Sequence, residues 1–394
     1  MTVPAPRVRR RPSAVGRALP LLLVVALLAP LALLFVQTWR LTDDDRDLVV
    51  SERLGVEYLR ALAPVTDALV EAQSAAVAGR TVSGDELTRA VEAVASVDAR
   101  IGDDLRAQER WAGLRAKLEA LSDRSPTDPE TAYAAYGETT ELLLDLHRKV
   151  RETSGLVRDP ESDSFFLQDG IGKDLPQAMI AAGRLADLTI LAAQRPAAQR
   201  ARTVAELAGV RVAALAPSAD MVTDLRAAVD SSESTNLGPT VLTPLDTYQR
   251  AVEALAAYST PTTPSGEVDA GRLVGARTAV QAAGRQLQPV ILGELDALLA
   301  DRLDDLDRER WLAVGAAATA VLLLAVLAAI LVTAARRARR RTAEARATTG
   351  DSGPLPSAPW QAPAGRPAEP RPLQPAGAGR EPASAQWGPF DAAR

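Results

Sequence analysis

Hydrophobic residues follow two different patterns along this chain. Two long apolar runs, residues 18–36 and residues 311–335, contain no charged side chain. Each run is long enough to cross the hydrocarbon core of a bilayer, about 30 Å thick, as a helix. Between the two runs, apolar residues recur at spacings of three and four with polar residues between them, which is typical of amphipathic helices. The pattern predicts a helical region flanked by two transmembrane helices.

The amphipathic region divides into a series of predicted helices separated by polar or proline-containing breaks. At two breaks an aspartate precedes a proline, at Asp128 and at Asp159, which is typical of an N-cap residue followed by the first helical residue. Leucines at spacings of three and four predict that the last helix runs unbroken to Trp311, with this seam packed against the first helix or a partner chain. The predicted helices cover residues 42–78, 84–121, 129–154, 159–196, 197–229, 243–258, and 267 into the second apolar run.

The composition favours the same structure. Alanine, leucine, arginine and acidic residues dominate, aromatic residues make up only 4% of the chain, and no alternating strand pattern is present. We therefore expect an all-α fold. It should be a membrane-anchored, elongated helical bundle of the four-helix-bundle type, built as one unit or as two stacked modules, with two transmembrane helices.

Charge predicts the orientation in the membrane. Residues 40–310 contain 45 acidic and 30 basic residues, a net charge of −15. Arginines cluster on the other side of each apolar run, so the positive-inside rule places both termini in the cytoplasm of a two-pass protein of the cell membrane. The first run exceeds the usual apolar core of a signal peptide and lacks a small-residue cleavage site, so we expect an uncleaved anchor. The clustered arginines are Arg7, Arg9, Arg10, Arg11, Arg17, Arg336, Arg337, Arg339, Arg340 and Arg341.

These features divide the chain into segments. Its last part holds ten prolines among small and polar residues and has no apolar face with which to build a core. The predicted segments are a basic cytoplasmic N-terminus (1–17), a first transmembrane helix (18–36), an extracytoplasmic helical domain (37–310), a second transmembrane helix (311–335), a basic juxtamembrane segment (336–350) and a disordered proline-rich tail (351–394).

Residue types exclude several kinds of chemistry. The chain has no cysteine, which rules out disulfides, thiolate metal sites and a cysteine nucleophile. Its single histidine, His147, lies within a predicted helix, so no histidine-rich metal site or histidine-based catalytic triad can form. The stretch "DGIGKD" at 169–174 lacks the first glycine and the final serine or threonine of a phosphate-binding loop. We expect a protein that is not an enzyme, has no cofactor, binds no metal and binds no nucleic acid.

The stretch "SGLVRDPESDSFFLQD" at 154–169 is the candidate site. It can be read as a helix junction, with Gly155 ending one helix and Asp159 capping the next. Phe165 and Phe166 would then fill the core, and we expect one of them to be deeply buried. It can also be read as a pocket for a small polar ligand, with an aromatic wall, a cation and carboxylates. The candidate ligand-binding residues are Arg158, Asp159, Asp163, Phe165, Phe166 and Asp169. Arg158 and Asp163 have the weakest structural reason to be present.

Two stretches resemble a known family. "ERLGVEYLRALAPV" at 52–65 and "SGLVRDPESDSFFLQDGIGKDLPQ" at 154–177 are similar to elements of the extracytoplasmic helical sensory domains of bacterial methyl-accepting chemotaxis receptors and related sensor histidine kinases. The second stretch follows their Ser-Gly-Leu-x-x-Asp-Pro-x-x-Asp-Ser-aromatic-aromatic-Leu-x-Asp pattern. The resemblance implies an elongated, dimeric helical bundle. The chain departs from the family after residue 341, where the kinase-controlling output region is replaced by the proline-rich tail.

These observations lead to two hypotheses about function. In the first, the chain is an extracytoplasmic sensory or ligand-binding module that lacks its own output and acts through a signalling partner protein. Its ligand would be a small polar molecule, and it would form a homodimer through its membrane-proximal helices. In the second, it is a structural or scaffolding protein of the envelope membrane with no small-molecule ligand.

Overall fold

The computed structural model describes residues 15–80, 84–123, 127–157, 162–232, 237–260 and 269–348. All regular secondary structure in these ranges is helical, which confirms the all-α prediction. The elements are α1 (Val15–Val77), α2 (Asp85–Ile101), α3 (Gln108–Asp123), α4 (Pro129–Ser154), α5 (Ser162–Asp169), the π-helical turn η1 (Gly170–Asp174), α6 (Leu175–Gln194), α7 (Ala197–Ser231), α8 (Leu237–Tyr258) and α9 (Ala270–Thr348).

The chain forms two compact units, Met1–Ala329 and Ile330–Arg394. The first unit holds the helical bundle. The described part of the second is the end of α9, whose arginines at 336–341 are exposed to solvent.

The ends of α4 show how the local sequence sets helix boundaries. Asp128 is the N-cap, and its Oδ2 accepts a hydrogen bond of 2.8 Å from the backbone N–H of Thr131. Pro129 occupies the first turn, where its missing N–H is not needed. At the other end Gly155 has a φ of 91°, a left-handed conformation that favours glycine. Both predicted boundaries of this helix are confirmed.

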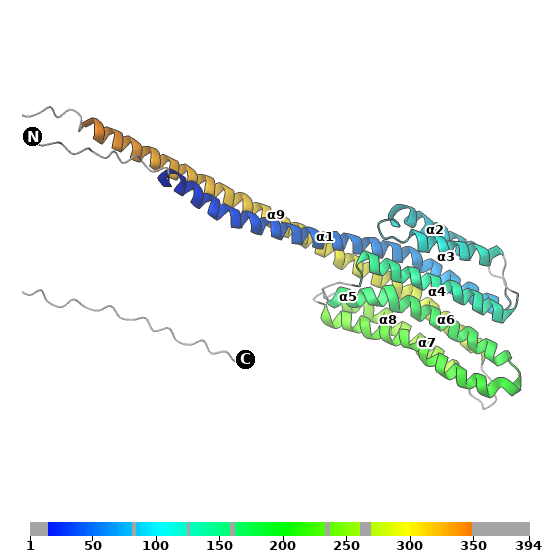
Figure 1. Ribbon diagram of the computed structural model, residues 1–394. Coiled ribbons are helices and arrows are strands. Elements are labelled where there is room, and N and C mark those ends of the chain that lie inside the picture. The colour runs from blue at the N-terminus through cyan, green and yellow to red at the C-terminus, as the bar shows by residue number, and fades with distance from the viewer. Residues whose placement is uncertain are drawn as a thin grey trace, which may run out of the picture. The chain divides into compact units, whose positions relative to one another are not determined.

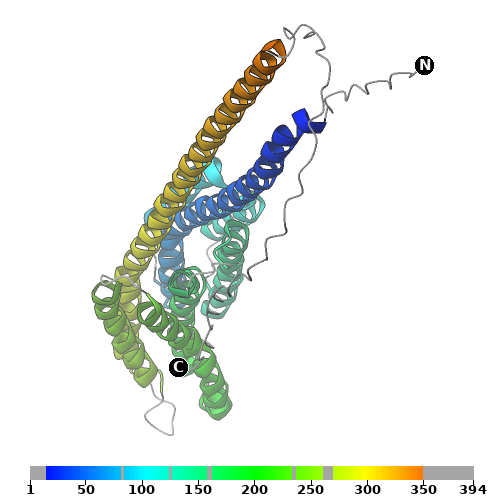
Figure 2. The same cartoon turned by 90° about the vertical axis from the view of Figure 1, so that its left-hand side faces the viewer.

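The first unit is a bundle of helices that includes α1 and the first part of α9 (Figures 1 and 2). Helix α1 contacts α2, α4 and α6, while α3 packs on α4 and α7 packs on α6 and α8. The core between them consists largely of leucines with no exposed surface, among them Leu62, Leu143 and Leu287. These contacts place α2, α4 and α6 beside α1, and they do not by themselves define a four-helix type or a stacking of two modules.

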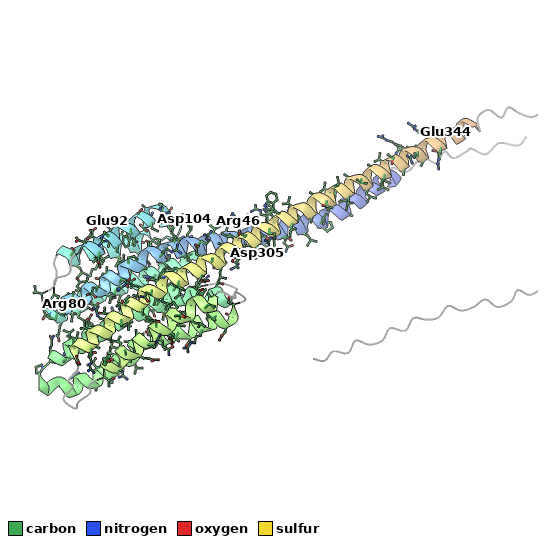
Figure 3. All side chains as sticks on the ribbon, turned by 180° about the vertical axis from the view of Figure 1, so that it is seen from behind. Arg46, Arg80, Glu92, Asp104, Asp305 and Glu344 are labelled. Carbon is green, nitrogen blue, oxygen red and sulfur yellow. The ribbon has the colours of Figure 1, made fainter. Side chains whose placement is uncertain are left out.

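Ion pairs join α1 to α9 near the point where both leave the bundle. Arg53 Nε lies 3.0 Å from Asp296 Oδ1, and Arg46 Nε lies 3.2 Å from Asp307 Oδ1. Figure 3 shows Arg46 close to this end of the bundle and Arg80 at the opposite end. The leucine seam of α9 packs inside the chain, because Leu295 is fully buried.

Helix α9 contains the only stretch within the described residues that is long and apolar enough, by length and composition, to cross a membrane. None of its most apolar window is buried inside the protein, unlike the core helix of a globular domain. The first apolar run lies within α1, but the side chains of residues 15–25 are outside the described residues. A second crossing therefore remains a prediction.

Two predicted boundaries are wrong. The single helix expected over 84–121 is broken at 102–107, where Gly102 ends α2 and Arg106 adopts a positive φ of 49°. Gly102, Asp103 and Asp104 have low helix propensity, but the helical periodicity on either side concealed the turn. Helix α8 begins at Leu237, earlier than expected, because it tolerates an internal proline at Pro244.

Candidate functional site

The candidate site lies where α4 ends and the chain turns into α5 and the π-helical turn η1. A π-helical turn is rare and often marks a functional position, because it shifts the helical register by one residue. Here it separates α5 from α6 and brings a group of charged side chains against α4 and α7. We call Arg151, Asp169, Lys173, Asp174 and Asp224 the junction cluster.

The two phenylalanines of α5 are partly buried, and Phe166 packs against the hydrophobic core. Their rings form an edge-to-face pair with centroids 5.6 Å apart. Both Phe165 and Phe166 are half-buried, so the expectation that one would be deeply buried is wrong. The inward face of α5 is formed by Ser164, Leu167 and Gln168, which are spaced one helical turn apart and are all buried.

Arg151 is the central cation of the junction cluster. It extends from α4, is only 7% exposed, and donates a hydrogen bond to Asp169 Oδ1 at the end of α5. Burial lowers the pKa of Arg151, but the carboxylates of Asp169 and Asp174 oppose this shift and keep the guanidinium charged. Lys173 adds a second cation, with its Nζ 3.7 Å from Asp169 Oδ2. The paired charges hold α4, α5 and η1 together.

Asp174 is the titratable group of the cluster. Only 1% of the residue is exposed, and the Lys173 ammonium lies 3.1 Å from Oδ1. Burial, helped by Asp224 on α7 and opposed by Lys173, raises the pKa of Asp174 to about 7. This carboxyl therefore exchanges a proton near neutral pH.

Buried polar groups extend the cluster toward α1. Glu52 of α1 is fully buried, and its Oε1 lies 3.5 Å from Gln168 Nε2 of α5. His147, one turn before Arg151, is also buried, and burial lowers its pKa to about 4. A neutral His147 contacts the carbonyl oxygen of Leu143 through Nδ1 at 3.0 Å. The histidine therefore serves packing within α4.

Glycines allow the close approach of these elements. A Cβ at Gly172 in η1 would lie 2.5 Å from Arg151 Cδ, so no side chain fits there. A Cβ at Gly155 would collide with Leu48 of α1, and the positive φ of Gly155 disfavours any other residue. The junction therefore packs closely on both α1 and α4.

The predicted site residues divide into three groups. Asp169 lies in the junction cluster, and the two phenylalanines form a ring pair on the same helix, α5. Arg158 and Asp159 are outside the described residues, and Asp163 is within α5 but its side chain is not described. A contact between Arg158 or Asp163 and a ligand thus remains a prediction.

Sequence reasoning missed Arg151, Lys173 and Asp174 as site residues. Arg151 occupies the apolar face of α4, four residues after His147, and a charged residue at such a position was the available signal. Its partners come from η1 and α7, and their proximity depends on the fold.

A second buried polar layer lies between α1, α6 and α9. Gln73 Nε2 donates a 2.9 Å hydrogen bond to Asp187 Oδ2, and Arg277 Nη2 lies 2.9 Å from Glu71 Oε2. Burial raises the pKa of Asp187 to about 6, and it raises the pKa of Asp67 on α1 to about 7. Within the described ranges no group of three or more acidic or histidine side chains could hold a metal ion. This layer gives the interior a second pH-sensitive position.

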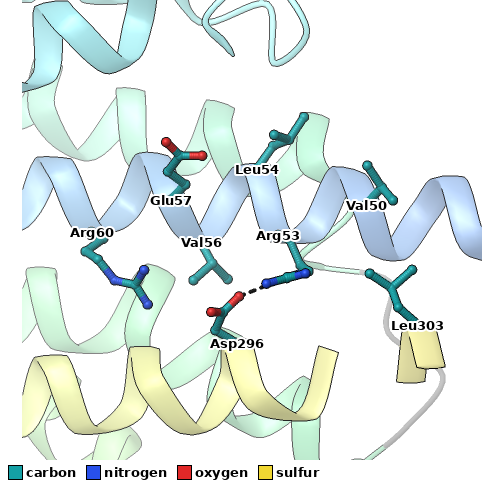
Figure 4. Close-up of a pocket in the computed structure, with 8 residues that line it drawn as sticks. All are labelled: Val50, Arg53, Leu54, Val56, Glu57, Arg60, Asp296 and Leu303. Atoms are coloured by element: carbon teal, nitrogen blue, oxygen red, sulfur yellow. Dashed lines mark hydrogen bonds and ion pairs between the residues drawn. The ribbon is translucent and has the colours of Figure 1, made fainter. Parts of the chain in front are cut away.

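An open groove follows the seam between α1 and α9 (Figure 4). We call it the α1–α9 groove. Its volume is about 460 Å³, which is in the size range of small-molecule sites. The Arg53–Asp296 ion pair crosses the groove. Arg60 Nη2 donates one long hydrogen bond of 3.4 Å to the Leu292 carbonyl oxygen, so much of its guanidinium remains available to a ligand. The lining residues are Val50, Arg53, Leu54, Val56, Glu57, Arg60, Asp296 and Leu303.

Comparison with known proteins does not identify this chain. No family model matches it, and neither a curated protein nor a solved structure matches it.

Proposed function

We propose that the chain is a two-pass membrane protein whose extracytoplasmic helical bundle is a sensory or ligand-binding module. It has no output region of its own and acts through a signalling partner protein. Both termini are cytoplasmic in this proposal, and the bundle at 37–310 is outside the cell.

The continuity of α1 and α9 is the observation that carries the proposal. Each helix runs without interruption from the bundle core into an apolar run. The ion pairs Arg53–Asp296 and Arg46–Asp307 join them along the way. Rigid helices transmit small displacements along their axes, so a ligand that moves one helix relative to the other would change the cytoplasmic ends.

The arginine clusters and the resemblance at 154–177 add support. Arginines on the far side of each apolar run favour cytoplasmic termini. The resembling segment supplies Asp169 to the junction cluster, which lies at a π-helical turn and contains a buried carboxyl whose pKa is raised to about 7. A small polar ligand that binds beside this cluster would change its packing or the protonation of Asp174.

A ligand screen on the full-length protein tests the proposal. The protein in a mild detergent is scanned by differential scanning fluorimetry against amino acids, organic acids and amines at millimolar concentration. We expect at least one compound to raise Tm, since a ligand at 100 times its Kd stabilises the folded state by about 2.7 kcal/mol.

Substitutions then locate the ligand. Arg158→Ala and Asp163→Ala should abolish the ligand-induced shift and leave the ligand-free Tm unchanged. Arg148→Ala, an exposed arginine on α4 paired with Asp145, is the matched control and should keep the shift. Loss of the shift in Arg60→Ala alone would place the ligand in the α1–α9 groove. A protein that responds to no compound would favour the scaffolding hypothesis.

A further inference from the structure

A cleft lies where α1 and α9 emerge from their apolar runs. It has a volume of about 340 Å³ and is lined by Phe35, Val36, Trp39, Arg40 and Val314. Four of these five residues are apolar or aromatic, and Val36 is 46% exposed. The cleft therefore offers a hydrocarbon surface with one cation at its edge. We call it the interface cleft.

The aromatic wall of the interface cleft is held rigidly. The rings of Phe35 and Trp39 lie 5.8 Å apart, one turn from each other on α1. The guanidinium of Arg310 from α9 covers the Trp39 ring, with Cζ 3.9 Å from the ring centroid. Arg310 also pairs with Asp43 Oδ1 at 3.3 Å. Tryptophan at such a position is typical of the boundary between hydrocarbon and headgroups.

Arg40 differs from the other arginines of this region. Arg310 and Arg46 are both paired, whereas the Arg40 side chain is exposed and has no hydrogen bond or ion pair to any residue that the structure describes. Asp44 follows Arg40 by four residues and is likewise exposed and unpaired within the described ranges. Residues four apart lie on the same face of a helix, so one cation and one carboxylate stand side by side above an apolar cleft.

From this arrangement we propose that the interface cleft binds a phospholipid with a primary-amine headgroup. The inference rests on the proposed two-pass topology. An acyl chain would contact Phe35, Val36 and Val314. The lipid phosphate would accept charge-assisted hydrogen bonds from Arg40, and its ammonium would donate to Asp44.

The surrounding charges select against other headgroups. Asp45 and Asp47 add carboxylates to this turn of α1, so an anionic headgroup meets repulsion. A choline headgroup has no N–H to donate to a carboxylate. A primary ammonium carries three donors and suits a cluster of carboxylates beside one arginine.

Native mass spectrometry of the full-length protein in detergent tests the inference. The probes are dioleoyl phosphatidylethanolamine, phosphatidylglycerol and phosphatidylcholine at equal concentration. We expect one phosphatidylethanolamine molecule to be retained with an affinity roughly tenfold above that of the other two, equivalent to about 1.4 kcal/mol. Arg40→Gln should reduce retention of phosphatidylethanolamine roughly tenfold. Asp44→Asn should abolish the preference for phosphatidylethanolamine over phosphatidylcholine.

Arg308→Gln is the matched control, because Arg308 lies on α9 near the cleft, is exposed and paired with Asp305, and does not line the cleft. It should leave lipid retention unchanged. Equal retention of all three lipids by the unmodified protein, an unchanged Arg40→Gln variant, or a dimer that excludes lipid would each overturn the inference. The outcome of this lipid-binding experiment does not affect the ligand screen for the proposed function. Failure of the protein to insert into lipid nanodiscs would contradict the two-pass topology itself.

Discussion

Replacing Asp174 with asparagine should make the stability of the protein less dependent on pH. The folded-state pKa of this carboxyl is raised from its ordinary value of 3.8 to about 7, because the group is buried beside Asp224. Between these two values unfolding releases a proton, so the free energy of unfolding falls as pH rises. The contribution of the protonated carboxyl is complete below about pH 4 and is lost progressively up to about pH 7.

The size of the effect follows from the two pKa values. Raising the pH from 5 to 8 should lower the free energy of unfolding by about 2–3 kcal/mol through Asp174 alone. For a domain of this size that corresponds to a decrease in Tm of roughly 5–10 °C. Asparagine has nearly the same shape and no charge, so Asp174→Asn should remove this part of the decrease.

Thermal unfolding of the full-length protein in detergent, followed by circular dichroism at several pH values, measures the effect. Asp67 and Asp187 also have raised pKa values, so the unmodified protein should lose more stability than Asp174 alone explains. Asp246→Asn, which removes an exposed carboxylate paired with Arg250, is the control and should keep the full pH dependence. If Asp174→Asn keeps it too, Asp174 is ionised throughout and the reasoning is refuted.

Three other predictions concern the junction, the tail and the topology. Gly155→Ala should destabilise the fold by about 1–3 kcal/mol, because the new Cβ would collide with Leu48 and because alanine disfavours the positive φ of this residue. An unchanged Tm would contradict this prediction. Deleting residues 350–394 should leave Tm unchanged, and a large decrease would show that the tail packs on the fold. Alkaline phosphatase fused at Arg341 should be inactive, and alkaline phosphatase inserted at 231–238 should be active. Activity of the fusion at Arg341 would refute cytoplasmic termini.

Helical periodicity and end signals predicted much of the fold. The Asp128 cap, the Gly155 terminus and the unbroken α9 all depend on residues close in sequence, and the structure confirms them. The π-helical turn could not be predicted, because the residues Gly170 to Asp174 have no periodicity that distinguishes it from an α-helix.

The candidate site was predicted only in part. The sequence indicated Asp169, which lies in the junction cluster, but it gave no sign that Arg151 would be its partner. Their pairing joins helices that are separated by the turn after α4, and it depends on how α5 packs against α7. Local patterns determine which residues start and end a helix, whereas buried ion pairs depend on tertiary packing.

Disulfide formation between α1 and α9 tests the central claim most directly. The chain has no cysteine, so Arg46→Cys and Asp307→Cys introduce a single pair at positions that face each other. A control pair, Arg226→Cys and Gln249→Cys, joins α7 and α8 at positions linked by a hydrogen bond of 2.8 Å. We predict that a ligand found in the screen changes the rate of disulfide formation by the α1–α9 cysteine pair in membranes by at least about threefold, equivalent to about 0.7 kcal/mol. The rate for the control pair should not change. A bound ligand that alters neither rate, or both equally, would contradict the proposal that α1 and α9 transmit a signal.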